Sequence, residues 1–487
     1  INYKILKHNR LYNIYTITDT GNNQSSFITD FFKTFTPLNK PEPSVYANKI
    51  TQFFTDIYSK DSLTKVRARN AISNVSYGAE NIDRIVNFIT SLQYGEQDYF
   101  EMKQKFISEL GYIDDSCCTD KVVQSLENIY KQTADTAYFQ NEIFWALENL
   151  QTKTSYTALK NFLLQDPPLF DDENDYNDFF EGLEDSLLLT RLLFPEILQL
   201  TTIEDYKEPV IDLLATLLDS GFIQAKDYEE YFSKIYFDAK IEMKKQQNAE
   251  EKLLEQQSQK SFDEDNSAND NYADRYYATD VDKYAALLLP FLDSNEALPK
   301  FFNRLLQSRD TGLQLSTAIL LIKNHKPVPD SILNGIASKD NYRSDLLEDL
   351  EEISQVDLFP AKYKKQELIA QSLLLNDSKK TAFAEIEPEG KTVVYTKGKK
   401  GYVYFFRYKI KKEDDWQIGI SGLQPEDLKK VGTDNTFVQL SNEKLTADKP
   451  APEQFNEQLL KLILKQHKSA AHFFEDDANP YDNFGDY

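Results

Sequence analysis

Residues 282–353 decide the fold, because five apolar segments follow one another there with almost no spacer: YAALLLPFLDS, ALPKFFNRLLQS, TGLQLSTAILLIKN, PDSILNGIAS and RSDLLEDLEEI. Leu313, Leu320 and Leu321 recur at helical spacing, and the breaks hold Asp, Ser, Asn, Pro or Gly. This pattern predicts short helices joined by tight turns. Helices of about ten to fourteen residues cannot bury their apolar stripes alone, so we expect a layered α-solenoid.

The same arrangement recurs earlier in the chain. Residues 65–89 and 139–163 can be laid over residues 313–336, with apolar residues at the end of a first helix and inside a second one. These positions are Ile72, Leu147 and Leu320, followed by Ile85, Leu159 and Ile332. Helix pairs of this kind resemble the HEAT and armadillo class of repeats, over residues 45–375. An irregular helical bundle without a true period is the alternative.

The charge of the chain narrows the classes of partner. Among 487 residues, 55 Lys and Arg face 79 Asp and Glu, which gives a net charge of −24. Nucleic acid needs a basic footprint, so we expect no nucleic-acid partner, and anionic membrane surfaces are disfavoured for the same reason. The sequence has no run of about eighteen apolar residues, so we expect no transmembrane segment in this chain. Solubility, loose cation binding or a basic protein partner fits this charge.

Residues 1–38 are predicted to form two strands and a helix. YKILKHNRLYNIYTIT reads as two strands around a turn at residues 9–10. One face of the following helix carries Phe27, Phe31 and Phe35. We interpret the region as the tail of an upstream α/β domain, because the chain begins in a strand without an initiator Met or a signal peptide. We therefore expect a fragment or a processed product.

Two helical blocks and a linker follow. We expect a first helical-repeat block at residues 45–258, an acidic linker at residues 259–275 and a second helical-repeat block at residues 276–378. The helix predicted over residues 244–260 has two adjacent leucines as its only large apolar side chains. Because it has no apolar face to bury, we expect it to project into solvent.

The period changes from 3.6 to 2 near the end of the chain, which predicts a β-sheet module with a covering helix at residues 379–470. KTVVYT, GYVYFFRYKI and WQIGIS are its strand candidates. Aromatic residues lie on both faces of the second candidate, so the sheet must be covered on both sides or present an aromatic surface. One candidate cover is a helix whose stripe is Phe455, Leu459, Leu462 and Ile463. Residues 471–487 read as an acidic tail.

No catalytic or cofactor-binding motif is present in the sequence. The chain lacks HExxH, GxxxxGK[ST], GxGxxG and GxSxG patterns, so we name no catalytic and no cofactor-binding residue. Its two cysteines, Cys117 and Cys118, are adjacent. We interpret them as ordinary thiols, and a vicinal disulfide or a soft-metal site is the alternative.

Three carboxylates of the linker match a calcium-loop spacing in part. Asp263, Asp265 and Asp274 fall at positions 1, 3 and 12 of such a loop. Position 6 is Ala268, where the turn needs glycine, and position 8 is Asp270, where an apolar residue anchors the loop. We therefore predict a disordered acidic linker with no metal and no cofactor, and calcium binding is the alternative.

Aromatic residues of the predicted sheet are candidates for a partner-binding face. They are Tyr404, Phe406 and Tyr408 of one strand, and Trp416 at the start of the next. Packing in the core is the competing interpretation for this face. For Trp145, in the helical region, we expect core packing.

Two pieces of the chain, RLYNIYTIT…FFKTF and GYVYFFRYKI…WQIGISGLQP, resemble large envelope proteins of Bacteroidota that carry a TraB/GumN-type domain near the N terminus. The resemblance implies export to the cell envelope, in the periplasm or at the outer membrane, and places any enzyme-like domain upstream of Ile1. It carries over no functional residue. A cytoplasmic location is the alternative.

These observations favour a mainly α-helical, non-catalytic scaffold that mediates protein–protein interactions in a cell-envelope assembly. We expect one or more protein partners, and a membrane-protein complex is one candidate. The competing hypothesis is the regulatory or substrate-binding half of a larger TraB/GumN-like envelope enzyme.

Overall fold

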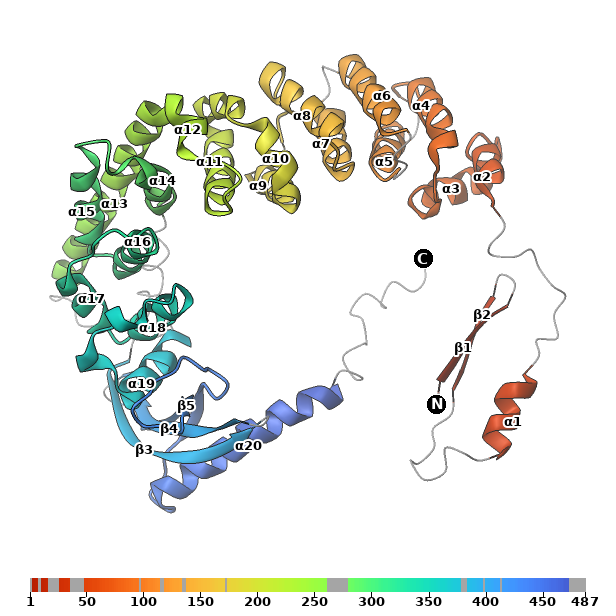
Figure 1. Cartoon of the computed structure of the whole chain (residues 1–487). Helices are drawn as coiled ribbons and strands as arrows, with labels where there is room; N and C mark the ends of the chain where they lie inside the picture. The colour runs from red at the N-terminus through yellow and green to blue at the C-terminus, as the bar shows by residue number, and fades with distance from the viewer. Residues whose placement is uncertain are drawn as a thin grey trace. The chain divides into compact units, whose positions relative to one another are not determined.

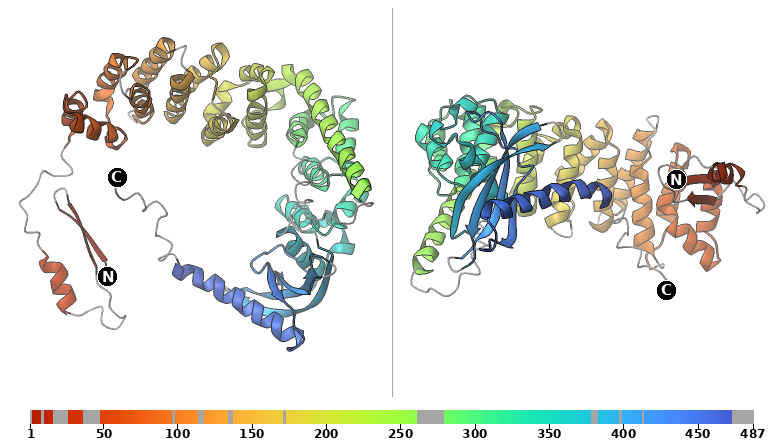
Figure 2. Two further views of the ribbon diagram at one scale, coloured as in Figure 1. Left: turned by 180° about the vertical axis from the view of Figure 1, so that it is seen from behind. Right: turned by 90° about the horizontal axis from the view of Figure 1, so that it is seen from below.

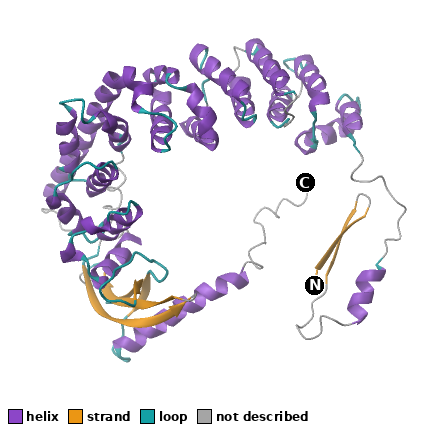
Figure 3. Ribbon diagram, in the orientation of Figure 1, coloured by secondary structure: helices purple, strands orange, loops and turns teal. Residues whose placement is uncertain are grey.

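The computed structural model describes residues 2–7, 10–15, 26–35, 48–95, 98–113, 118–133, 137–170, 173–260, 279–377, 383–396, 399–411 and 414–472. The described chain is mainly helical, and a small antiparallel sheet of four strands lies near the C terminus (Figure 1; Figure 3). This confirms the predicted α-rich class and the position of the sheet. None of its helices is long and apolar enough to cross a membrane, as far as the described residues reach.

The chain divides into two compact units, which we call unit 1 (Ile1–Gln199) and unit 2 (Leu200–Tyr487). The division falls inside the predicted first helical block, at residues 45–258. The boundaries expected from composition stay predictions.

Unit 1 begins with the predicted hairpin. Strands β1 (Asn2–Lys7) and β2 (Arg10–Tyr15) pair antiparallel, with Lys7 opposite Arg10. The predicted helix is also present as α1 (Ser26–Thr34). The upstream α/β domain to which we assigned these elements stays a prediction.

The rest of unit 1 is a succession of short helices. Its α-helices are α2 (Ile50–Ile57), α3 (Ser62–Asn70), α4 (Ile82–Ser91), α5 (Tyr99–Gly111), α6 (Thr119–Gln132), α7 (Ala137–Asn149), α8 (Lys153–Gln165), α9 (Glu173–Gly182) and α10 (Leu187–Thr190). In the described residues, the 3-10 helices η1 (Ile72–Asn74), η2 (Ala79–Asn81) and η3 (Leu183–Ser186) lie between them. After α10 follow η4 (Arg191–Leu193) and η5 (Glu196–Thr202), which leads into unit 2.

Local signals explain where these helices start. The Asp61 side chain accepts a hydrogen bond from the Thr64 amide at 2.8 Å and caps α3, and Thr152 forms a capping box with Ser155 at the start of α8. Each helix then buries its stripe on neighbours in the sequence: α5 packs against α7, and α8 packs against both α6 and α7. Residues 65–89 and 139–163 each contain parts of two α-helices, α3 with α4 and α7 with α8, as predicted. Ile72, expected at the end of the first helix, lies in η1 instead.

A glycine sets how closely α5 and α7 approach. Gly111 is buried at the end of α5, and a Cβ atom added there would lie 2.7 Å from the Cα of Ala146 and 2.8 Å from its carbonyl oxygen. Neither backbone atom can move aside as a flexible side chain could. Glycine is therefore required by the helix–helix contact itself.

Unit 2 contains residues 282–353, whose pattern predicts short helices joined by tight turns. Its α-helices are α11 (Glu204–Asp219), α12 (Ala225–Tyr228), α13 (Phe232–Lys260), α14 (Val281–Leu288), α15 (Leu298–Leu306), α16 (Thr311–Lys323), α17 (Asp330–Ala337), α18 (Arg343–Glu352), α19 (Gln366–Asp377) and α20 (Ala451–His472). Its 3-10 helices are η6 (Glu229–Tyr231), η8 (Leu289–Phe291), η9 (Val356–Leu358) and η10 (Ala361–Tyr363). Residues 282–353 thus form short helices joined by turns, as predicted.

Helix α13 corrects only part of the prediction that residues 244–260 project into solvent with nothing to bury. Glu251, Lys252, Leu254 and Glu255 are exposed as predicted, whereas the preceding part of the helix is packed. One side of α13 buries polar residues four apart: Asp238, Glu242, Gln246 and Glu250. The Thr279 hydroxyl donates to Gln246 Oε1 at 3.1 Å, and the Arg309 amide donates to Glu250 Oε2 at 3.2 Å. A polar stripe can be buried when hydrogen bonds satisfy it, and a count of apolar residues cannot detect this.

The C-terminal sheet is a meander in the order β3 (Glu385–Thr396), β4 (Lys399–Lys409), β5 (Gln417–Pro425) and β6 (Gln439–Lys444), with each strand antiparallel to the next. The three predicted strands are confirmed. The fourth, QLSNEK, was missed because it is short and mostly polar and shows no apolar alternation.

A helix covers each face of this sheet. On one face, Val403 and Phe405 of β4 pack against Phe455 and Leu459 of α20, which confirms the predicted covering helix. Both views of Figure 2 show α20 lying along the sheet. The other face packs against Ala370 and Leu374 of α19. The sequence left two possibilities for this sheet, coverage on both sides or an exposed aromatic surface. The structure shows coverage on both sides.

Replacing Gly111 with alanine tests the contact between α5 and α7. We expect Gly111→Ala to lower the free energy of unfolding by about 1–3 kcal/mol, because the new methyl group overlaps backbone atoms of α7. Chemical denaturation of both proteins measures this difference.

The matched control is Gly335→Ala in α17, where a Cβ atom meets nothing within 4 Å. That variant should be more stable than the wild type by about 0.4–1 kcal/mol. Equal effects at the two glycines would contradict the interpretation of the α5–α7 contact.

Candidate functional site

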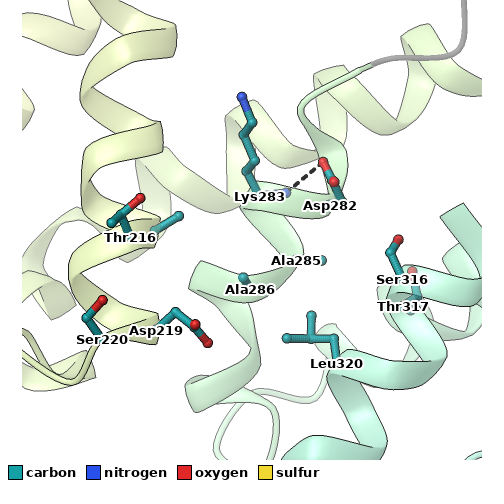
Figure 4. Close-up of a pocket in the computed structure, with 11 residues that line it drawn as sticks. Thr216, Asp219, Ser220, Asp282, Lys283, Ala285, Ala286, Ser316, Thr317 and Leu320 are labelled. Carbon is teal, nitrogen blue, oxygen red and sulfur yellow. Dashed lines mark hydrogen bonds between the residues drawn. The ribbon is translucent and has the colours of Figure 1, made fainter. Parts of the chain in front are cut away.

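Unit 2 contains a groove between three helices, which we call the α14 groove. Helix α14 contacts both α11 and α16 and lies between them. The groove has a volume of about 420 Å³, in the range of small ligand pockets. Its lining includes Ala285, Ala286, Asp282 and Lys283 of α14, Ala215, Thr216 and Asp219 of α11 with Ser220 directly after it, and Ser316, Thr317 and Leu320 of α16 (Figure 4).

The groove exists because the side chains that meet there are small. Helix α14 turns its large residues, Val281, Leu287 and Leu288, into the core, where they are buried. Alanines 285 and 286 are left facing the groove, and the adjacent walls carry serine and threonine. Leucines at these positions would fill the space and remove the groove.

One polar group of the groove lacks a partner. Thr317 is only 1% exposed, and its Oγ1 has no hydrogen-bond partner in the part of the chain that the structure describes. A buried hydroxyl without a hydrogen bond costs about 1–3 kcal/mol. This oxygen has almost no exposed surface, so a ligand would recover part of that cost only after a neighbouring side chain moves aside.

Acidic residues outnumber lysines around the groove. The Lys283 ammonium lies 2.6 Å from Asp212, 3.2 Å from Asp280 and 3.8 Å from Glu208. Burial raises the pKa of Asp212 above its usual value, although Lys283 acts in the opposite direction. Burial acts to lower the pKa of Lys283, but its hydrogen bond to Asp212 and the charges of Asp212 and Asp280 raise it overall, so the ammonium stays charged.

The rim of the groove carries two further carboxylates. Asp219 pairs with Lys323 at 2.5 Å, and both side chains are more than half exposed. Asp282 accepts a hydrogen bond from the Lys283 amide at 2.9 Å, drawn as a dashed line in Figure 4. No lysine or arginine among the described residues pairs with Asp282, so its charge faces solvent at the rim.

The aromatic residues predicted to bind a partner are mostly core residues. Tyr404, Phe406 and Tyr408 are 6%, 0% and 2% exposed, so the prediction of an open face is corrected for these three. The reason is α19, which covers this side of the sheet and whose position the strand pattern could not reveal. The Tyr408 hydroxyl donates to the Ser441 carbonyl at 3.1 Å.

Trp416 differs from the other three because it is only half-buried. The Arg407 guanidinium lies 4.5 Å from the Trp416 ring, and the Lys409 ammonium lies 4.7 Å from it. Both cations belong to this sheet and stabilise the ring where it is. The prediction of partner binding at Trp416 stays a prediction.

The remaining predicted positions are the linker carboxylates, the two cysteines and Trp145. Asp263, Asp265 and Asp274 of the calcium-like spacing lie outside the described residues, as does Cys117, whereas Cys118 immediately precedes α6. Within the described ranges, no group of three or more His, Cys, Asp or Glu residues is placed to hold a metal ion. Trp145 packs its ring 5.6 Å from that of Phe179, as expected for a packing role, although it is only half-buried.

Unit 1 contains a buried carboxyl group that sequence reasoning missed. Glu148 of α7 is 8% exposed and packs against Gly182 at the end of α9. Burial, together with the nearby charge of Asp185, raises the pKa of Glu148 to about 7. No local motif marks such a residue, because its environment is assembled from separate helices.

Comparison of the chain with protein-family models, with curated proteins and with solved structures finds no match. The residues and their geometry are therefore the basis for inferring function.

Replacing Lys283 tests the electrostatic account of the groove. We expect Lys283→Ala to lower the free energy of unfolding at pH 7 by about 1–3 kcal/mol, because Asp212 and Asp280 lose their counter-charge. The loss should shrink at pH 4, where the partly buried Asp212 carboxyl, with its raised pKa, takes up a proton.

Urea denaturation at both pH values measures the difference. Lys323→Ala removes a lysine from an exposed pair and should cost at most about 1 kcal/mol. A loss at Lys283 that is the same at pH 4 and pH 7 would show that the carboxylates are not its cause.

Glu148 predicts how the stability of unit 1 depends on pH. Its folded pKa of about 7 exceeds the unfolded value of about 4.3, so its ionisation in the fold costs stability as pH rises between these values. We expect Glu148→Gln to gain stability relative to the wild type by up to about 3 kcal/mol between pH 5 and pH 8.

Denaturation of wild type and variant across this pH range checks the prediction. Glu181→Gln, at an exposed position of the neighbouring helix α9, reports the effect of losing one surface charge. A Glu148→Gln difference that does not grow with pH would rule out a buried ionisation at this position.

Proposed function

We propose that this chain is a non-catalytic α-helical scaffold that mediates protein–protein interactions, and that the α14 groove is one of its docking sites. The supporting observation is the groove itself: α11, α14 and α16 leave a space of about 420 Å³ between them, with an alanine floor and hydroxyl-bearing walls. Proteins dock on such surfaces through a few side chains that enter pockets.

The proposal extends to the architecture of the helical region. We propose that the helix pairs stack as a HEAT-like solenoid, in which each pair covers the next. Support comes from the packing of helices on their neighbours in the sequence, such as α15 on α16 and α16 on α17. Repeats of this kind present extended surfaces to partners.

The location in a cell envelope is part of the same proposal. It is supported by the resemblance of two segments to Bacteroidota envelope proteins with a TraB/GumN-type domain. In the alternative, the chain is the regulatory or substrate-binding half of such an enzyme, and it would then change the rate of a reaction rather than hold a partner.

Affinity capture from the envelope fraction of the cells that make this chain tests the proposal. We expect the wild type to recover a protein partner in stoichiometric amount. Ala286→Trp places a large ring in the groove and should lose that partner. Ala297→Trp makes the same exchange at an exposed position before α15 and should retain it.

Circular dichroism and thermal denaturation of both variants establish that they are folded. Recovery of no stoichiometric partner by the wild type, or equal recovery by all three proteins, would overturn the proposed function.

A further inference from the structure

We propose that the α14 groove binds a lysine or arginine side chain carried by an extended segment of a protein partner. This inference rests on the proposed function and adds to it the chemical class of the docked residue. Three features of the groove point to it: the excess of carboxylates at the rim, the apolar floor and the hydroxyl of Thr317.

The charge of the rim favours a cation. Asp282 and Asp219 line the groove, and Glu208, Asp212 and Asp280 surround the adjacent Lys283. Lys283 is held by three carboxylates, and Lys323 is held by Asp219. Asp282 has no basic partner among the described residues, so an incoming ammonium or guanidinium group can pair with it without displacing a lysine of this chain.

The floor suits the aliphatic part of the same side chain. Ala285 and Ala286 form an apolar surface, and Leu320 adds a larger apolar group from α16. Lysine and arginine bury their methylene stems on apolar surfaces while their charged ends stay at the polar edge. An acidic side chain of the partner would instead meet the charge of Asp282, and an apolar one would leave that charge unpaired.

The walls offer hydrogen bonds to the backbone of the segment. Thr317 Oγ1 is buried and has no partner in the described part of the chain, and Ser316 lies beside it on the exposed side of α16. Thr216 of α11 and Ser220, the residue after α11, lie opposite them (Figure 4). The Ser316 hydroxyl donates to the Leu313 carbonyl at 3.2 Å and keeps acceptor capacity, so this wall can accept a hydrogen bond from an N–H group of an extended chain. A side-chain movement that uncovers Thr317 Oγ1 would add a second hydroxyl.

A titration with short synthetic peptides tests the inference. The probes are a peptide of alternating lysine and alanine and two versions in which glutamate or serine replaces lysine. Binding is followed by calorimetry of the full chain at two salt concentrations. We expect the lysine peptide to bind, with an affinity that falls as salt rises, and the glutamate and serine peptides to bind at least tenfold more weakly.

Three variants distinguish binding in the α14 groove from non-specific binding to the acidic surface of the chain. Asp282→Lys should lower the affinity for the lysine peptide by about tenfold or more, because it reverses the charge at the rim. Glu230→Lys changes the net charge equally at an exposed position outside the groove and should leave the affinity within about twofold. Ala286→Trp carries no charge and should abolish binding.

The outcomes distinguish the two levels of the proposal. If the serine or glutamate peptide binds as tightly as the lysine peptide and Ala286→Trp abolishes that binding, the groove docks peptides but the basic class is wrong. If the lysine peptide binds Ala286→Trp or Asp282→Lys as well as the wild type, it is held by the acidic surface as a whole, and the inference fails. If none of the three peptides binds, the inference fails as well, and the capture experiment alone then decides the proposed function.

Discussion

The helices around the α14 groove depend on the burial of one short helix. Helix α14 has eight residues, and five of them, Val281, Tyr284, Ala285, Leu287 and Leu288, are buried. They are covered by α11, α13 and α16, so three other helices are positioned against α14. The Tyr228 hydroxyl adds a buried hydrogen bond of 2.8 Å to the Leu287 carbonyl. An isolated helix of this length is unstable in water, so its packing and not its propensity maintains it.

The α14 groove follows from the same constraint. Because the large side chains of α14 point into the core, only small or charged ones remain on the side between α11 and α16. Helix α13 packs on α14 with both apolar and polar residues: Ile235, Ala239 and Met243 are buried, and hydrogen bonds satisfy the buried Gln246 and Glu250. The packing that stabilises the core thereby leaves an open, acidic surface beside it.

Much of the fold could be predicted from the sequence, because local signals specify it. Periodic leucines and polar breaks predict the helices of residues 282–353, and alternation predicts three strands of the sheet. The stripe on α20, with Phe455 and Leu459, predicts one cover. The second cover, α19, could not be assigned to the sheet, so the sequence left open whether Tyr404 and Phe406 are buried or face a partner. The strand β6 and the polar face of α13 were missed because neither has an apolar pattern.

The candidate site could not be predicted, since no single segment carries it. Ala286, Thr216 and Thr317 are ordinary residues of three helices, and their significance arises only when those helices are packed. Glu148 is a similar case, because α7 and α9 together create its environment. The overall charge of −24 does suggest a basic partner, but it does not place one. Packing places the charge of Asp282 beside an apolar floor. That combination suits a lysine or arginine side chain, which has a charged end and an apolar stem.

NMR with labelled alanine and threonine methyl groups tests the central claim most directly, because it reports where a basic peptide binds. Upon titration with the lysine–alanine peptide, the account predicts saturable shifts at Ala285, Ala286, Thr216 and Thr317 and none at alanines and threonines remote from the groove. Shifts spread over the acidic surface, or shifts that leave the methyl groups of the α14 groove unchanged, would contradict it.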